Sequence, residues 1–280
     1  MKYPKEFENL IESTQENLIG WGNPNAKILI VGKESAIPVG KEEAGDVQYC
    51  REIINNKKMW SANLNSDISQ DSIERCQFDE RGNILNFTEE SYNPLYPYKG
   101  QQCCIRRVYK KDDRIVKIAS PKGTSMTWYN YQRLCDLIRM EPSLPTKMND
   151  FHRFAFTTEL SVVAGKYSKE VDKSERRKSI EARKMFFSND FFKRFSIIIL
   201  AAGNYPDMYG ISHELFWGTT ESVTEINSSP FKGIYKVVYL NGDVKRLFIR
   251  TYQLSMVSNE LIKEIADRCI EFKNKYSIEL

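Results

Sequence analysis

The 280-residue chain has 41% hydrophobic residues, enough to bury a substantial core, and its 41 basic and 37 acidic residues give a net charge of +4. That charge is too small to indicate a nucleic-acid partner by itself, so composition leaves the function open. The sequence contains no run of about 18 apolar residues, so it predicts no transmembrane helix. Its amphipathic N-terminus lacks the pattern of a signal peptide. We therefore expect a globular, cytoplasmic protein and no membrane partner.

The N-terminal part predicts a helix, a buried strand and a long polar segment. Leu10 to Leu18 belongs to the helix, and the turn Asn23-Pro24-Asn25 leads into the strand Lys27 to Val31. Four consecutive apolar residues suit a strand covered on both faces, as in a parallel sheet. The polar segment from Lys41 to Leu95 is interpreted as an insertion or lid on that sheet.

The middle of the chain predicts two pairs of a helix followed by a strand. The helix over residues 124–138 precedes a strand around residues 153–158. The helix over residues 179–195 precedes the apolar strand 196–203. Strands that alternate with helices predict an α/β fold: a three-layer αβα domain with a mostly parallel central sheet.

The C-terminal part predicts a hairpin and a last helix. Asn241-Gly242 lies between two alternating apolar segments, which is the strongest short-range hairpin signal. The last helix begins near Ser255 or Ser258 and runs to about Lys273. With no internal repeat and no Pro/Gly-rich linker, residues 1–280 are expected to form one domain with an insertion at about 41–95.

Polar residues follow each predicted strand. The carboxyl ends of parallel strands meet at one edge of a sheet, where loops converge and helix N-termini offer N–H groups. A candidate site is therefore expected there, built from Gly32-Lys33-Glu34-Ser35, Thr157-Thr158-Glu159, Gly203-Asn204 and the loop Thr251 to Ser255.

The order of five segments resembles the uracil-DNA glycosylase superfamily, in particular the branch that often carries an iron–sulphur cluster. The segments are GNPNAKILIVGKES, PYKG, RFAFTTELS, FFKRFSIIILAAG and TYQLSMVS. The resemblance covers roughly residues 20–36, 95–138 and 150–272. It implies that family's fold and a DNA glycosylase activity, in which a flipped base is excised from DNA.

The resemblance also implies roles for residues of the site. Glu34 would orient water or stabilise the sugar cation, and Gln253 would donate its amide to a base oxygen. Gly32, Lys33 and Ser35 surround the acid in the family's first motif and would contact the base or substrate. Tyr98 would stack on the base, Thr158 and Glu159 would read its edge, and Ser255 would hold the flanking phosphate. A glutamate prefers N–H donors, which argues for a substrate other than plain uracil, or for no base at all.

The sequence departs from the family at several positions. Gln253 stands where the closing loop usually presents a histidine, or Arg250 does in a shifted alignment. Neither His152 nor His213 falls in that loop, and Thr158 replaces the base-reading asparagine. The cysteines have no counterparts of the cluster ligands and no C-x-x-C pair, so we interpret them as reduced thiols and expect no metal or cofactor. These are Cys50, Cys76, Cys103, Cys104, Cys135 and Cys269.

Two basic clusters indicate contacts with a DNA backbone. One lies in residues 106–122, which predict a hairpin with a charged tip, and the other in residues 173–184, on a helix or the loop before it. We expect a monomer that binds single- or double-stranded DNA. The predicted phosphate contacts are Arg106, Arg107, Lys110, Arg176, Arg177 and Arg250.

Each of these residues also has a structural interpretation. Glu34 can satisfy the N–H groups of a helix N-terminus, and Tyr98 can be an ordinary packed aromatic residue. Gln253 and Ser255 can belong to a turn and a helix cap, and charge runs are often solvated faces. Two functions besides the glycosylase thus stay open: a catalytically diverged protein that binds a nucleobase or nucleic acid, and a hydrolase of small N-glycosides.

Overall fold

The computed structural model describes residues 3–66, 68, 92–97, 108–111, 114–117, 125–141, 149–218, 223–227, 233–255 and 257–279. Its centre is a seven-stranded sheet in the order β1-β5-β2-β6-β9-β8-β7. The strands are β1 (Trp21–Gly22), β2 (Ile28–Gly32), β5 (Ala155–Glu159), β6 (Ile197–Ala201), β7 (Val223–Asn227), β8 (Ile234–Asn241) and β9 (Lys245–Thr251).

The sheet is mixed. Its central strands β5, β2, β6 and β9 are parallel, whereas β1, β8 and β7 pair antiparallel with their neighbours. The expected parallel sheet is confirmed for the centre but not for the flanks. The predicted Asn241-Gly242 turn joins β8 to β9, and a tight turn reverses the chain, so the two strands it connects must be antiparallel.

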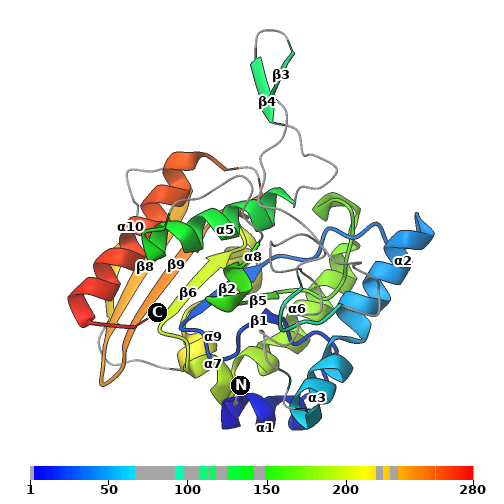
Figure 1. Cartoon of the computed structure of the whole chain (residues 1–280), viewed down its shortest axis with the longest axis horizontal. Coiled ribbons are helices and arrows are strands. Elements are labelled where there is room, and N and C mark those ends of the chain that lie inside the picture. The colour runs from blue at the N-terminus through cyan, green and yellow to red at the C-terminus, as the bar shows by residue number, and fades with distance from the viewer. Residues whose placement is uncertain are drawn as a thin grey trace, which may run out of the picture.

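Helices cover both faces of the sheet, which gives an α/β architecture with three layers (Figure 1). Ile28 and Ile30 of β2 pack with α5 (Met126–Arg139) and α10 (Asn259–Tyr276). Leu29 and Val31 face the opposite layer, because successive side chains of a strand alternate. That layer contains α1 (Lys5–Ser13), α3 (Asn56–Ser66), α6 (Lys173–Phe187), α7 (Asp190–Lys193), α8 (Tyr205–Tyr209) and α9 (Glu214–Trp217).

Two of the predicted helices have different bounds in the structure. The first helix, expected from Leu10 to Leu18, ends at Ser13, because Leu18 and Ile19 bury their side chains from an extended connection. The helix expected over residues 179–195 is two helices. Asp172 caps α6, and Asn189 begins α7 by accepting a hydrogen bond from the Phe191 N–H, as short polar side chains do at helix starts.

Residues 43–66 of the predicted insertion are helical and contribute to the core. They contain α2 (Glu43–Tyr49), the π-helical turn Cys50–Ile54 and α3. The Trp60 side chain is fully buried and donates to the Gly20 carbonyl at 2.9 Å. Asn56 accepts from the N–H groups of Ile19 and Gly20 at 3.0 and 3.2 Å. These bonds fix the connection that enters β1.

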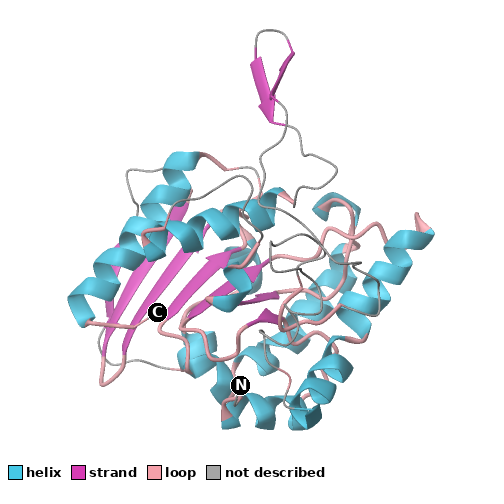
Figure 2. Cartoon of the chain, in the orientation of Figure 1, coloured by secondary structure: helices cyan, strands magenta, loops and turns pink. Residues whose placement is uncertain are grey.

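The basic hairpin predicted within residues 106–122 is confirmed. β3 (Val108–Lys111) and β4 (Arg114–Lys117) pair antiparallel, with Lys111 opposite Arg114. Figure 2 shows the pair standing apart from the layers of the domain. Within the described ranges, no helix combines the length and the apolar character that crossing a membrane requires.

Candidate functional site

A cavity of about 210 Å³ lies at the carboxyl ends of β2 and β5. Its lining comes from the loop after β2, the end of β5, the loop after β9, the first turns of α5, the edge strand β1, and the α2 and π-helical segment. The lining residues are Trp21, Gly32, Glu34, Ser35, Ala36, Ile37, Gln48, Glu52, Ser125, Thr127, Trp128, Tyr131, Thr157, Thr158, Glu159 and Gln253.

The parallel pairing of β2 with β5 brings the predicted acids together. Gly32 lies opposite Glu159, and backbone bonds from Leu160 N to Gly32 O and from Ser161 N to Lys33 O extend the pairing past the strand ends. Glu34 and Glu159 therefore leave adjacent strands on the same edge of the sheet. The sequence-based expectation that strand-end residues share one site is confirmed for Gly32, Glu34, Ser35, Thr158, Glu159 and Gln253.

Glu34 is a buried carboxylate with one oxygen partnered and one open. Its residue is 4% exposed. Oε1 accepts a hydrogen bond from the Tyr205 hydroxyl at 3.0 Å and lies 3.5 Å from a guanidinium nitrogen of Arg176. Oε2 has no hydrogen-bond partner among the described residues. Tyr205 and Arg176 thus anchor one oxygen of the carboxylate, while the described residues leave the second oxygen without a hydrogen bond.

Glu159 differs from Glu34 because no cation bonds to its carboxyl group in the described structure. Its Oε2 is buried without a hydrogen-bond partner and lies against Gly32, where a Cβ atom would overlap it. Burial, followed by the charge of Glu34, raises the pKa of Glu159 to about 8, although Arg183 opposes the shift. Near neutral pH this side chain holds a proton and can donate it.

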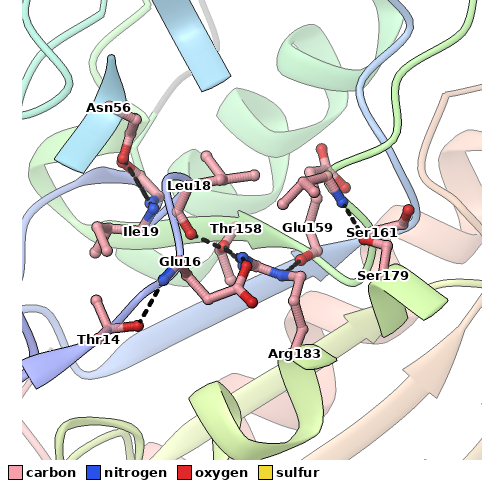
Figure 3. Close-up of polar contacts among 12 residues, drawn as sticks. Thr14, Glu16, Leu18, Ile19, Asn56, Thr158, Glu159, Ser161, Ser179 and Arg183 are labelled. Atoms are coloured by element: carbon pink, nitrogen blue, oxygen red, sulfur yellow. Dashed lines mark hydrogen bonds and ion pairs between the residues drawn. The ribbon is translucent and has the colours of Figure 1, made fainter. Parts of the chain in front are cut away.

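Arg183 fixes the end of β5 from the opposite side (Figure 3). The fully buried guanidinium donates to the Glu159 and Leu18 carbonyls at 2.9 and 2.8 Å. It also donates to the Thr158 hydroxyl at 2.9 Å and to the Glu16 carboxylate at 3.0 Å. The position of Glu159 in the cavity therefore rests on a rigid, well-bonded strand end.

Aromatic rings form part of the cavity wall. Trp21 comes from β1, and its indole N–H donates to the Tyr92 hydroxyl at 2.6 Å. Trp128 and Tyr131 come from the first turns of α5, whose N-cap Ser125 accepts from the Trp128 N–H. Together they offer flat apolar surface beside the carboxyl groups, which suits a planar ligand.

Several predicted site residues lie elsewhere. The Lys33 ammonium group lies 4.7 Å from the centre of the Tyr205 ring, outside the cavity lining, and burial lowers its pKa. Ser255 does not line the cavity, and the last helix is capped by Ser258 instead. Tyr98 lies outside the described residues, so the predicted stacking ring has no described position.

The predicted phosphate contacts also take different positions. Arg176 is buried against Glu34, which leaves no exposed guanidinium for a phosphate and corrects its assignment. Arg250 forms a double hydrogen bond with Asp207. Arg177 is exposed beside the Tyr209 ring. Lys110 lies in β3, but its side chain is outside the described part, as are Arg106 and Arg107.

The lining residues that sequence reasoning missed include Trp21, Glu52, Trp128 and Tyr131. Trp128 and Tyr131 fit the apolar stripe of a helix, so the pattern indicated core packing. Trp21 lies in a two-residue edge strand that has no periodicity. Glu52 lies in a π-helical turn within the polar segment, and π-helical turns occur frequently at functional sites but carry no simple sequence signal.

No group of three or more His, Cys, Asp or Glu residues is arranged to hold a metal ion in the part of the chain that the structure describes. Cys50, Cys135 and Cys269 are free thiols, whereas Cys76, Cys103 and Cys104 lie outside the described residues. Comparison with protein-family models, curated proteins and solved structures found no match.

Proposed function

We propose that this chain is an N-glycosidic hydrolase that takes a nucleobase of DNA into the strand-end cavity, as the resemblance to the uracil-DNA glycosylase superfamily implies. The proposal depends above all on Glu34 and Glu159, which line one cavity from adjacent strands but differ in their surroundings. Glycoside hydrolysis commonly uses two carboxyl groups, one as an acid and one as a carboxylate.

The two groups would divide the reaction as follows. The bond between C1′ and the base nitrogen breaks, and its electron pair moves to the base, which takes the proton of Glu159. The Glu34 carboxylate stabilises the positive charge that develops on the sugar. A water oxygen then bonds to C1′ and gives a proton to Glu34, and exchange with solvent restores both glutamates.

The rest of the lining would hold the base. The cavity is smaller than the roughly 300–1,000 Å³ of pockets that take drug-sized ligands, so it suits a single base with the sugar outside. Stacking on an aromatic ring contributes about 1–3 kcal/mol per base. Thr158, Ser35 and Gln253 would contact the polar edges of the base, as expected from the sequence.

Basic residues outside the cavity would bind the DNA backbone. We assign this role to the exposed Arg177 and to the basic residues of the β3–β4 hairpin region, and we propose that the protein acts as a monomer. Binding should then weaken as salt concentration rises, because phosphate contacts release counterions.

Base release from single-stranded oligonucleotides, each with one altered base, tests the proposal. Glu34→Gln keeps the size of the side chain but removes its charge, and we expect it to slow release by about 10²–10³-fold or more. Glu181→Gln, on the exposed surface of α6, is the matched control and should release base at the wild-type rate. Release by Glu34→Gln at the wild-type rate would refute the role of this acid.

A binding protein without hydrolase activity is the second candidate. It is favoured by the contacts of Glu34 Oε1, which Tyr205 and Arg176 already occupy, and by Gln253, whose neutral amide stabilises a leaving anion less well than an imidazole. Measurable affinity for oligonucleotides, no base release from any of them, and little change in affinity on Glu34→Gln would support it.

A further inference from the structure

The cavity lining combines acidic and aromatic side chains. It contains Glu34, Glu52 and Glu159, and none of the described residues that line it is Lys, Arg or His. Two guanidinium groups lie behind the acids: Arg51 is 3.1 Å from Glu52, and Arg176 is 3.5 Å from Glu34. The lining therefore presents carboxyl groups to a ligand and offers no positive charge to a bound anion.

Glu159 receives no such cation at its carboxyl group. Arg183 bonds to the backbone carbonyl of Glu159, and within the described part of the chain Oε2 of Glu159 has no hydrogen-bond partner. Glu34 lines the same cavity, and its Oε2 is likewise buried without a partner among the described residues. Two carboxyl oxygens in one small cavity are stabilised by a ligand that brings a positive charge or hydrogen-bond donors.

The aromatic walls favour the same ligand. The faces of Trp and Tyr rings attract cations, and the attraction grows when both groups are shielded from water. Trp21, Trp128 and Tyr131 all line the cavity. A flat cation can thus lie against an aromatic face and direct its edge at the glutamates.

We propose that the cavity selects positively charged, N-alkylated nucleobases over neutral ones, an inference that rests on the base-excision function proposed above. When the glycosidic bond of such a base breaks, the electron pair of the bond neutralises the charge, so the base leaves as a neutral molecule without a proton donor. A neutral base reaches the same state by taking the proton of Glu159.

Proton release should accompany binding of the cation. The groups that face the Glu159 carboxyl are Glu34 after β2, Arg183 on α6 and Tyr131 on α5. A cationic base favours the ionised form of Glu159, so below the pKa of about 8 its binding must expel a proton. Affinity for the cation should therefore increase as the pH rises from 6 to 8.

Two labelled single-stranded oligonucleotides test the inference by fluorescence anisotropy with the full chain. They differ at one central base, which is 3-methylcytosine, a cation at neutral pH, or its neutral isomer 5-methylcytosine. At pH 7 we expect roughly tenfold tighter binding of the cationic isomer. Glu159→Gln should weaken the preference and abolish its rise with pH, whereas the control Glu181→Gln should keep both at the wild-type level.

Equal affinity for the two isomers, or a preference in Glu159→Gln that keeps its wild-type size and its rise with pH, would overturn the inference. Base release from the same oligonucleotides and from a uracil-containing one separates the two proposals. Selective binding of 3-methylcytosine without any release would refute the hydrolase and keep the inference. Release of uracil without a preference for the cation would keep the hydrolase and refute the inference.

Discussion

Arg183 and the carboxyl group of Glu159 lie at the same strand end but differ in how the protein satisfies them. The Arg183 guanidinium, on α6, donates to four partners, which belong to β5 and to the connection after α1 (Figure 3). Glu159 Oε2 is buried and has no hydrogen-bond partner among the described residues. Buried polar groups are normally paired, so an open one at a cavity marks a place where a ligand can supply the missing partner.

The largest expected loss of unfolding free energy comes from removing the Arg183 guanidinium. Arg183→Met keeps much of the side-chain length but leaves the Thr158 hydroxyl, two carbonyls and Glu16 without their donor. Removing one partner of a buried charged network costs about 3–5 kcal/mol of unfolding free energy. Urea denaturation at pH 7 measures this loss. A change below 1 kcal/mol would show that the guanidinium does not hold this strand end.

Substituting Glu159, whose carboxyl oxygen lacks a partner among the described residues, should increase the unfolding free energy. The folded-state pKa of Glu159, about 8, lies above its ordinary value of 4.5. Below pH 4.5 both states of the protein hold the proton. As the pH rises to 8, the unfolded state loses the Glu159 proton before the folded state does. The unfolding free energy of the wild type therefore falls by up to about 1.4 kcal/mol per pH unit because of this group.

Glu159→Gln removes this dependence. Relative to the wild type, the variant should gain up to about 5 kcal/mol of unfolding free energy between pH 4.5 and pH 8, because the window spans 3.5 pH units. Parallel urea titrations of the two proteins across this range measure the difference. Curves that stay parallel would mean that the carboxyl group ionises normally in the folded protein.

Glu34 is intermediate between these two cases, with one partnered oxygen. Tyr205→Phe removes the 3.0 Å hydrogen bond to Oε1 and leaves Arg176 in place. The expected loss is about 0.5–1.5 kcal/mol of unfolding free energy. Thermal unfolding measures it, with Tyr167→Phe, an exposed tyrosine, as the control. A loss as large as that of Arg183→Met would show that Tyr205 supports the core and not only the acid.

The sequence predicted much of the site because strand ends follow simple rules. Apolar runs identified β2 and β6, and the parallel arrangement of the central strands brought Glu34, Glu159 and Gln253 to one edge, as expected. The Asn241-Gly242 turn located the last hairpin for an equally local reason. These features depend on residues close in sequence, and they could be predicted without knowing the rest of the fold.

The remaining features depend on contacts between distant segments. Arg176 and Arg177 are adjacent in a basic run, and no sequence pattern shows that one is buried beside Glu34 while the other is exposed. The π-helical turn that carries Glu52 and the edge strand that carries Trp21 are too short for a periodic signal. The aromatic wall therefore became visible in the fold and not in the sequence.

Gly32 has one more consequence for the molecule. Gly32 does not have a left-handed backbone conformation, so its φ and ψ angles would accept a larger residue. A Cβ atom at this position would, however, overlap the Glu159 carboxyl group. One absent methyl group thus makes room for the acid. Adding that carbon, as in Gly32→Ala, would displace the Glu159 carboxyl group from its position beside residue 32. This substitution offers a way to obstruct the cavity while the domain stays folded.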